Sequence, residues 1–123
     1  MRPILLITGA SAGIGAACAK LAAADYDLAL NYRSDKAGAE AVAREAETKG
    51  ARTLICQGDV AVPDDVARIF AKVDHHFKRL DALINNAGIV DAVATVADMD
   101  HARLKRMFDV NVIGAMMVAQ AAA

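Results

Sequence analysis

Short runs of apolar residues alternate along this chain with longer stretches in which apolar residues recur at helical spacing. Four of the short runs are bounded by glycine or polar residues, as strands buried on both faces are, at positions 4–7, 28–30, 53–56 and 80–84. Strands that alternate with helices pair in parallel through right-handed crossovers, and the helices cover both faces of the sheet. The pattern predicts a three-layer, doubly wound α/β fold with about four parallel strands.

Apolar stripes predict which helix faces meet the sheet. The stripe after the first strand has the spacing i, i+3, i+4, i+7, i+8 and consists of Ile14, Ala17, Cys18, Leu21 and Ala22. A weaker stripe between positions 39 and 46 predicts a second helix that ends at Gly50. The clearest stripe predicts a third helix, which begins near Pro63 and presents Val66, Ile69, Phe70, Val73 and Phe77.

Two further helices are predicted in the last quarter of the chain. Leu104, Met107 and Phe108 mark the first of them, and Asp98 is the expected N-cap because its carboxylate can accept a hydrogen bond from the first turn. The second begins near Val112 and continues to the alanines at positions 121–123.

The composition excludes several classes of protein. Hydrophobic residues make up 56% of the 123 residues and charged residues 24%, which is typical of a globular chain. The net charge of -1, with both signs interspersed, favours neither a nucleic-acid nor a membrane partner. No apolar run reaches the roughly 18 residues that span a bilayer. Cys18 and Cys56 are far apart and are expected to be reduced thiols in a cytoplasmic protein, and no metal site is expected.

A glycine-rich turn lies between the first predicted strand and the first predicted helix. The sequence Thr8-Gly-Ala-Ser-Ala-Gly-Ile-Gly15 has the pattern T-G-x-x-x-G-x-G. Gly9 permits a tight turn, Gly13 lets the backbone approach a pyrophosphate, and Gly15 lets the helix pack close to the strand. The N–H groups at the helix start can then bind phosphates. In this context the turn predicts a dinucleotide site of Rossmann type.

With this turn, the chain resembles the short-chain dehydrogenase/reductase family, and the match covers essentially its whole length. Further motifs occur in the family's order, namely Asp59-Val60, Asn85-Asn86-Ala87-Gly88, Asn111 within Asp109-Val-Asn, and Asn31-Tyr32-Arg33-Ser34. The resemblance implies that the pyrophosphate and the start of the nicotinamide side are lined by Gly9, Ser11, Gly13, Ile14 and Gly15. It also implies that the adenine amine is bound by Asp59, with Val60 beside it.

The resemblance implies roles for the later motifs as well. The adenosine ribose would be contacted, and the centre of the sheet braced, by Asn86, Ala87 and Gly88. Asn111 would support catalysis by helping to hold a catalytic lysine through a water molecule.

The end of the second predicted strand indicates which nicotinamide cofactor is bound. Sites for NAD carry a carboxylate about 20 residues after the glycine turn, which binds the ribose 2′-hydroxyl. Here Tyr32, Arg33 and Ser34 occupy this region, and the first carboxylate is Asp35. A guanidinium can bind a 2′-phosphate bidentately and a hydroxyl can add a further bond. We therefore expect NADP(H) to be preferred over NAD(H).

The family's catalytic serine and Tyr-x-x-x-Lys pair would lie beyond the segment of Asn111. Tyr32 and Lys36 have the Tyr-x-x-x-Lys spacing, but they lie at the adenosine end, so we interpret this spacing as a coincidence. Residues 1–123 are thus expected to form an NAD(P)-binding Rossmann domain truncated before the catalytic segment. The intact parent is expected to be an NADP(H)-dependent oxidoreductase of small or medium alcohol or carbonyl compounds. Family members are commonly dimers or tetramers, and the same is expected of the parent.

Two alternatives remain open. The chain could be a truncated, non-catalytic nucleotide-binding module, or a different doubly wound protein such as a flavodoxin-like domain, although the Asn85–Gly88 motif and Asn111 argue against the latter. On its own, the chain is expected to be inactive, to leave one sheet edge unpaired, and to expose apolar side chains around Val112, Ile113 and Met116.

Overall fold

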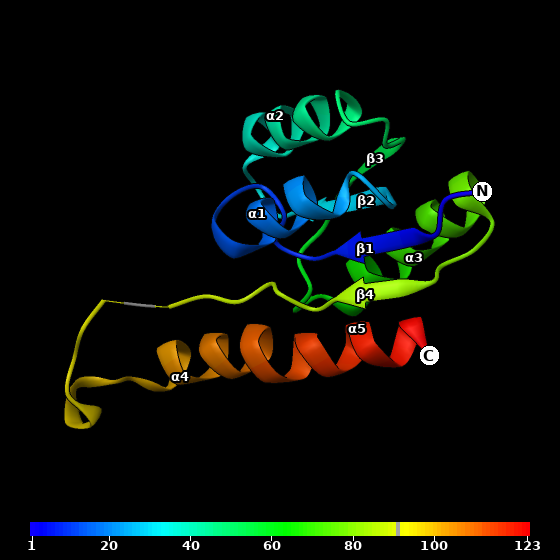
Figure 1. Ribbon diagram of the computed structural model, residues 1–123. Helices are drawn as coiled ribbons and strands as arrows, with labels where there is room; N and C mark the ends of the chain where they lie inside the picture. The colour runs from blue at the N-terminus through cyan, green and yellow to red at the C-terminus, as the bar shows by residue number, and fades with distance from the viewer. Residues whose placement is uncertain (91) are drawn as a thin grey trace.

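A four-stranded parallel sheet forms the centre of the molecule (Figure 1). The computed structural model describes residues 1–90 and 92–123. The strands pair in the order β3-β2-β1-β4, so that β1 and β2 are central. Their bounds are β1 Ile4–Ile7, β2 Asp27–Tyr32, β3 Thr53–Gln57 and β4 Ala82–Ile84. The prediction of four strands in parallel pairing is confirmed.

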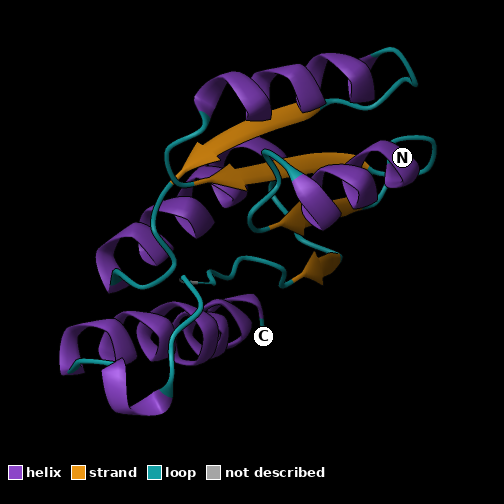
Figure 2. Cartoon of the chain, turned by 90° about the vertical axis from the view of Figure 1, so that its left-hand side faces the viewer, coloured by secondary structure: helices purple, strands orange, loops and turns teal. Residues whose placement is uncertain are grey.

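Helices cover both faces of this sheet (Figure 2). One face packs against α1 and α2 through the odd-numbered side chains of β1, Leu5 and Ile7, together with Leu28 and Leu30 of β2. The other face packs against α3 through alternate residues of the same strands, since successive side chains point to opposite faces. The helices of the first three crossovers are α1 Gly13–Ala22, α2 Lys36–Glu47 and α3 Pro63–Phe77. This arrangement confirms the three-layer fold, of which the chain forms the first part.

The last part of the chain is one continuous helical rod, whose C-terminal part, α5, lies beside α3 and whose α4 end projects away from the sheet (Figure 1). The rod consists of α4 His101–Phe108, the π-helical segment η2 Asp109–Gly114, and α5 Ala115–Ala122. Val110 and Val118 of the rod are buried against Val60 and Val66. Two separate helices were expected here, whereas the structure joins them through η2 without a turn.

The predicted buried face of α1 is only partly correct, because Cys18 and Ala22 pack half-buried against the core but Ile14 and Leu21 do not. The residues of α1 that are buried are Gly15, Ala16 and Ala19, whereas Ile14 is 74% exposed and Leu21 is 80% exposed. The physical reason is the close approach of this helix to β1, because a Cβ on Gly15 would lie 2.3 Å from the carbonyl oxygen of Gly9. Only residues with little or no side chain fit at that distance.

Asp98 was expected to be the N-cap of α4, but this prediction is wrong. The cap is Asp100, whose Oδ1 accepts a hydrogen bond from the Arg103 amide at 2.8 Å. Asp98 instead lies in the short 3-10 helix η1 Val96–Asp98, where its carboxylate accepts a hydrogen bond from Thr95 Oγ1 at 2.9 Å. The helix therefore begins two residues, about half a turn, later than predicted.

The helices of the described residues are also too short or too polar to cross a membrane.

Candidate nucleotide site

The segments that follow all four strands meet at one edge of the sheet and enclose a cleft of about 230 Å³. Parallel strands place their carboxyl ends at the same edge, which is where open α/β sheets bind ligands. The cleft is lined by Gly9, Ser11, Ala12, Asn31, Arg33, Ser34, Asp35, Gly58, Val60, Ala87, Gly88, Ile89 and Val110. The structure therefore brings together residues of every motif singled out in the sequence.

The N-terminus of α1 presents backbone groups that fit a phosphate. Gly9 and Gly13 have φ values of +64° and +58°, which residues with a side chain rarely adopt. A Cβ added to Gly13 would meet no protein atom within 4 Å, so the backbone there is open to a ligand. The N-cap is Ala12, which provides no side-chain hydrogen bond, and the first turn has no acidic residue. The first N–H groups of the helix thus lack intrahelical and capping partners. They form a site at which an anion is favoured.

Thr8 and Asn86 clamp the segment after β4 onto the glycine turn. The Oγ1 atom of Thr8 accepts hydrogen bonds from the amides of Asn86 and Ala87, both at 2.9 Å. The Nδ2 atom of Asn86 donates to the carbonyl oxygens of Thr8 and Gly9, both at 3.1 Å. The Asn86 side chain therefore holds the segment after β4 against the glycine turn, while Ala87 and Gly88 line the cleft.

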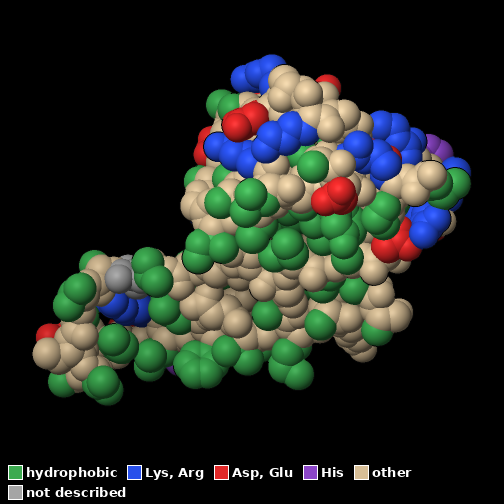
Figure 3. All heavy atoms as spheres, viewed as in Figure 1, with side chains coloured by type: hydrophobic (Ala, Val, Ile, Leu, Met, Phe, Trp, Pro, Cys, Tyr) green, Lys and Arg blue, Asp and Glu red, His purple; other side chains and the backbone are tan. Residues whose placement is uncertain are grey.

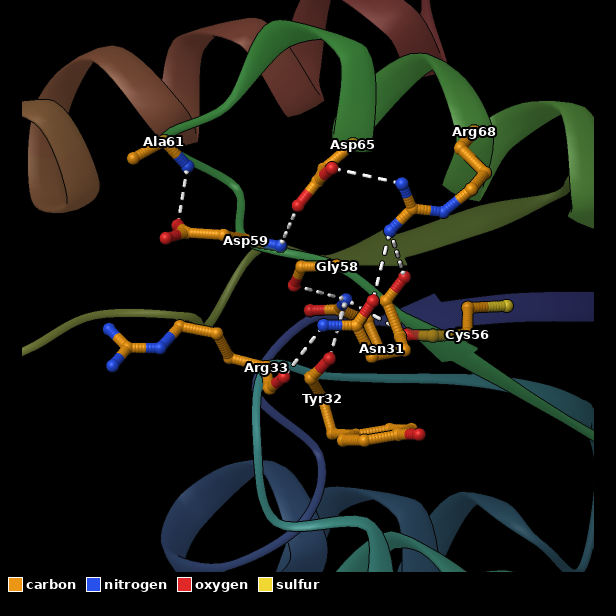
Figure 4. Close-up of polar contacts among 10 residues, drawn as sticks. Asn31, Tyr32, Arg33, Cys56, Gly58, Asp59, Ala61, Asp65 and Arg68 are labelled. Atoms are coloured by element: carbon orange, nitrogen blue, oxygen red, sulfur yellow. Dashed lines mark hydrogen bonds and ion pairs between the residues drawn. The ribbon is translucent and has the colours of Figure 1, made fainter.

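Asn31 of β2 lines the cleft and connects the segment after β1 to the end of β3, although it is not among the residues predicted from the sequence to form the site. Its side chain is 2% exposed. Oδ1 accepts from the Gly9 amide at 3.2 Å, and Nδ2 donates to the carbonyl oxygens of Cys56 at 3.1 Å and Gly58 at 3.2 Å (Figure 4). The sequence does contain one indication of this role, because Asn31 directly follows the apolar run at positions 28–30 of a buried strand. A polar side chain buried in this way is nearly always hydrogen-bonded.

The three residues expected to recognise a 2′-phosphate do not lie together. Arg33 and Ser34 are exposed and line the cleft. Tyr32 is 7% exposed, its side chain diverges from that of Arg33 (Figure 4), and it is absent from the cleft lining. Asp35 also lines the cleft, but its Oδ1 accepts the Gly38 amide at 2.9 Å and caps α2. Arg33 is therefore the cation that faces the cleft from this turn.

Both carboxylate oxygens of Asp59 have protein partners. Oδ1 accepts from the Ala61 amide at 2.9 Å, and Oδ2 accepts from Arg106 Nη1 of α4 at 3.1 Å. The neighbouring Val60 is buried and lines the cleft. The Asp59 carboxylate is thus fixed at the end of β3 by a turn of its own backbone and by the helical rod.

Asn111 lies in the π-helical segment and holds the chain that follows Gly88. Its Oδ1 accepts from the Ile89 amide at 2.7 Å, and its Nδ2 donates to the Ile89 carbonyl oxygen at 2.8 Å. Single π turns are frequent at functional sites. Among the other predicted residues, Ser11 lines the cleft, Gly13 and Gly15 form the start of α1, and Ile14 points to solvent.

Cys56 lies below the cleft and is not a candidate nucleophile. Its side chain is 1% exposed, and burial raises the pKa of its thiol to about 11. A thiol with this pKa is protonated at neutral pH, whereas nucleophilic attack requires the thiolate.

Comparison with known proteins identifies relatives along nearly the whole chain. The family described as short chain dehydrogenase matches residues 3–123. An oxidoreductase of Methylorubrum extorquens that is named as uncharacterized is 38% identical over 97% of this chain, which covers 48% of that protein. The chain thus spans about half the length of the curated relatives it matches.

Solved structures with the same fold cover the chain to a similar extent. A short-chain type dehydrogenase/reductase from Mycobacterium marinum matches with a TM-score of 0.92 and 34% identity, over 98% of this chain and 48% of that one. A protein from Burkholderia cenocepacia crystallised with bound NADP matches with a TM-score of 0.92 and 26% identity, over 98% of this chain and 47% of that one.

Proposed function

Because this chain belongs to the short-chain dehydrogenase family, we propose that it forms the nucleotide-binding half of an NADP(H)-dependent oxidoreductase. The substrate of the intact parent would be a small or medium alcohol or carbonyl compound. One observation carries the proposal: the uncapped, glycine-lined start of α1 faces a cleft at the carboxyl edge of a parallel sheet.

The nicotinamide group, when bound, supplies or accepts the hydride, and the residues of this chain bind and orient the dinucleotide. Amide groups at Gly13 and its neighbours in the first turn of α1 would hold the pyrophosphate. Val60 would border the adenine, and Asp59, which Arg106 holds in place, would accept a hydrogen bond from its amino group. The adenosine ribose would contact Ala87 and Gly88, which line the cleft.

The preference for NADP(H) would come from Arg33 and Ser34, which face the cleft. Among the described residues, no hydrogen bond or ion pair occupies the Arg33 guanidinium, whereas the next carboxylate along the chain, that of Asp35, is engaged as the cap of α2. A free guanidinium can bind a phosphate bidentately. The NADP bound to the Burkholderia cenocepacia relative is consistent with this preference.

Catalytic groups of this family would come from the rest of the parent protein. The Tyr32 side chain is 7% exposed, and Lys36 pairs with Glu40 at 3.9 Å on α2, so this pair is not suited to proton transfer at a substrate. Asn111 would act in support by holding the segment at Ile89 and, as in the family, a catalytic lysine through water.

Substitution of Arg33 tests the cofactor preference. Wild-type protein is expected to bind NADP+ more tightly than NAD+ in isothermal titration calorimetry. Arg33→Ala should weaken NADP+ binding about ten- to a hundredfold, because a charge-assisted contact is lost, and should leave NAD+ binding unchanged. The matched control is Arg44→Ala, since Arg44 is exposed on α2 and outside the cleft lining. Equal affinities for both cofactors, or unchanged NADP+ binding by Arg33→Ala, would contradict the proposal.

A further inference from the structure

The backbone of Arg33 is held from the neighbouring edge strand by the side chain of Gln57. In the β2–β3 register, Gln57 lies opposite Tyr32. The Nε2 atom of Gln57 donates to the Arg33 carbonyl oxygen at 2.8 Å, and the next amide, that of Gly58, donates to the Tyr32 carbonyl oxygen at 2.9 Å. Two successive carbonyl groups at the end of β2 are therefore anchored to β3.

Arg68 of α3 fixes the orientation of the Gln57 amide. Its Nη2 donates to Gln57 Oε1 at 3.0 Å and to the Gln57 carbonyl oxygen at 2.9 Å. A guanidinium only donates, so the oxygen of the Gln57 amide must face it. The amide nitrogen is left facing the Arg33 carbonyl oxygen. Reversal of the amide would place a donor against a donor and an acceptor against an acceptor.

Asp65 connects this set of bonds to the loop that carries Asp59. Its Oδ1 pairs with Arg68 Nη1 at 2.9 Å, and its Oδ2 accepts from the Asp59 amide at 2.9 Å (Figure 4). The hydrogen bond from the Asp59 amide has the larger effect and that from Arg68 the next, and together they hold the pKa of Asp65 below its usual value. Asp65 is thus ionised at neutral pH and keeps Arg68 in position.

We propose that Gln57, oriented by Arg68, is a positioning residue that fixes the backbone of Arg33 for recognition of a 2′-phosphate at the cleft. This inference rests on the proposed function and deepens it. With the main chain of Arg33 fixed, binding of the phosphate orders only the guanidinium side chain, which lowers the entropic cost of recognition. The specificity for the phosphorylated cofactor then depends on a residue that does not line the cleft.

The test uses two ligands that differ only in the 2′-phosphate, adenosine 2′,5′-bisphosphate and adenosine 5′-monophosphate. Their dissociation constants are measured by titration calorimetry, and their ratio reports recognition of the 2′-phosphate alone. Gln57→Met keeps the length of the side chain but removes the donor. It should lower the preference for the bisphosphate about three- to tenfold, the effect of one net hydrogen bond, with little change for the monophosphate.

A matched control and a double variant separate positioning from general destabilisation. Thr53→Val also removes a solvent-exposed side-chain hydrogen bond from a residue of β3, that from the half-buried Thr53 Oγ1 to Glu47 at 3.1 Å, and should leave the ratio unchanged. In an Arg33→Ala background, Gln57→Met should have no further effect on the ratio, because Gln57 acts through Arg33.

The outcomes distinguish failure of this inference from failure of the proposed function. If Arg33→Ala lowers the ratio but Gln57→Met does not, or if the two effects add independently, Gln57 is not a positioning residue and the cofactor proposal stands. If wild-type protein shows no preference for the bisphosphate, or Arg33→Ala leaves that preference intact, the proposed NADP(H) preference fails and this inference with it.

Discussion

At the scale of single residues, two glycines of the turn after β1 are required for different physical reasons. Gly13 has φ +58° and open space at the position of a Cβ, so a side chain there would be strained but would not collide with protein atoms. Gly15 has helical backbone, but its Cβ would lie 2.3 Å from the carbonyl oxygen of Gly9. Gly13 therefore leaves room for a ligand, whereas Gly15 allows α1 to pack closely against the turn after β1.

The two glycines therefore predict different effects of the same substitution. Gly13→Ala should lower the free energy of unfolding by about 1–2 kcal/mol, the cost of a side chain in the left-handed region, and should weaken NADP+ binding. Gly15→Ala should lower it by more than about 3 kcal/mol, because backbone atoms must move. Urea unfolding followed by circular dichroism measures both. Equal losses of stability in the two variants would show that the helix can accommodate a Cβ at Gly15 without the predicted movement of the backbone.

The sequence alone identifies the glycine turn but not the residues that support it. The glycines of the turn act through the backbone conformation of neighbouring residues, so a short sequence pattern is enough to identify them. The role of Asn31 depends on Gly9, Cys56 and Gly58, which only the tertiary structure brings together. The buried face of α1 was partly mispredicted because alanines occur on both sides of this helix, and hydrophobicity does not report how closely a helix approaches a strand.

At the scale of elements, the short strand β4 is attached to β1 by Asp81 as well as by backbone pairing. Oδ2 of Asp81 accepts from the Ile4 amide at 2.7 Å, and Oδ1 pairs with Arg79 at 2.5 Å. The hydrogen bond from Arg79, followed by that from Ile4, lowers the pKa of Asp81. The ionised carboxylate therefore stabilises the junction between these two strands.

This lowered pKa predicts a loss of stability in acid. Because the folded pKa lies below the unfolded value of about 3.9, the stabilisation is present above that pH and is lost as the pH falls toward the folded pKa. Urea midpoints measured between pH 7 and pH 3 should fall in acid for wild-type protein. They should fall less steeply for Asp81→Asn, and less steeply for Asp65→Asn for the same reason. A pH dependence unchanged by Asp81→Asn would contradict the role of this carboxylate.

The sequence patterns predict the strands and helices correctly but misplace some of the boundaries between them. The stripe of α3 and the start of that helix at Pro63 agree with the structure, because an amphipathic face of four turns is a strong signal. The start of α4 was misplaced because Asp98 and Asp100 are both acceptable caps, and only the observed hydrogen bond to Arg103 distinguishes them. Nothing in the local pattern indicates that η2 joins α4 to α5 as π helix.

At the scale of the whole molecule, the rod of α4, η2 and α5 exposes a series of large apolar side chains (Figure 3). Phe108 is 59% exposed and Met116 is 69% exposed, and the same rod also exposes Leu104, Val112 and Ile113. Large apolar side chains gathered on one exposed element mark an interaction surface or favour aggregation. The exposure expected around Val112, Ile113 and Met116 is therefore confirmed.

Exposure on the rod predicts self-association of the isolated chain. Sedimentation velocity should show species larger than a monomer, whose fraction increases with protein concentration. The double variant Phe108→Glu/Met116→Glu should shift the protein toward monomer, because charges would be buried in the contact. Val96→Glu is the control, since Val96 is 84% exposed but lies in η1. A monomeric wild-type chain at all concentrations would contradict the prediction.

The most direct test of the account is where NADP+ binds on the chain, measured by amide chemical-shift changes in ¹⁵N-labelled protein. If phosphates bind the amides at the start of α1, the largest changes should occur at Gly9, Gly13 and Gly15, with further changes at Arg33 and Gly88. Absence of any change, or changes confined to residues outside the cleft such as those of α3 and α5, would contradict the assignment of this corner as the nucleotide site.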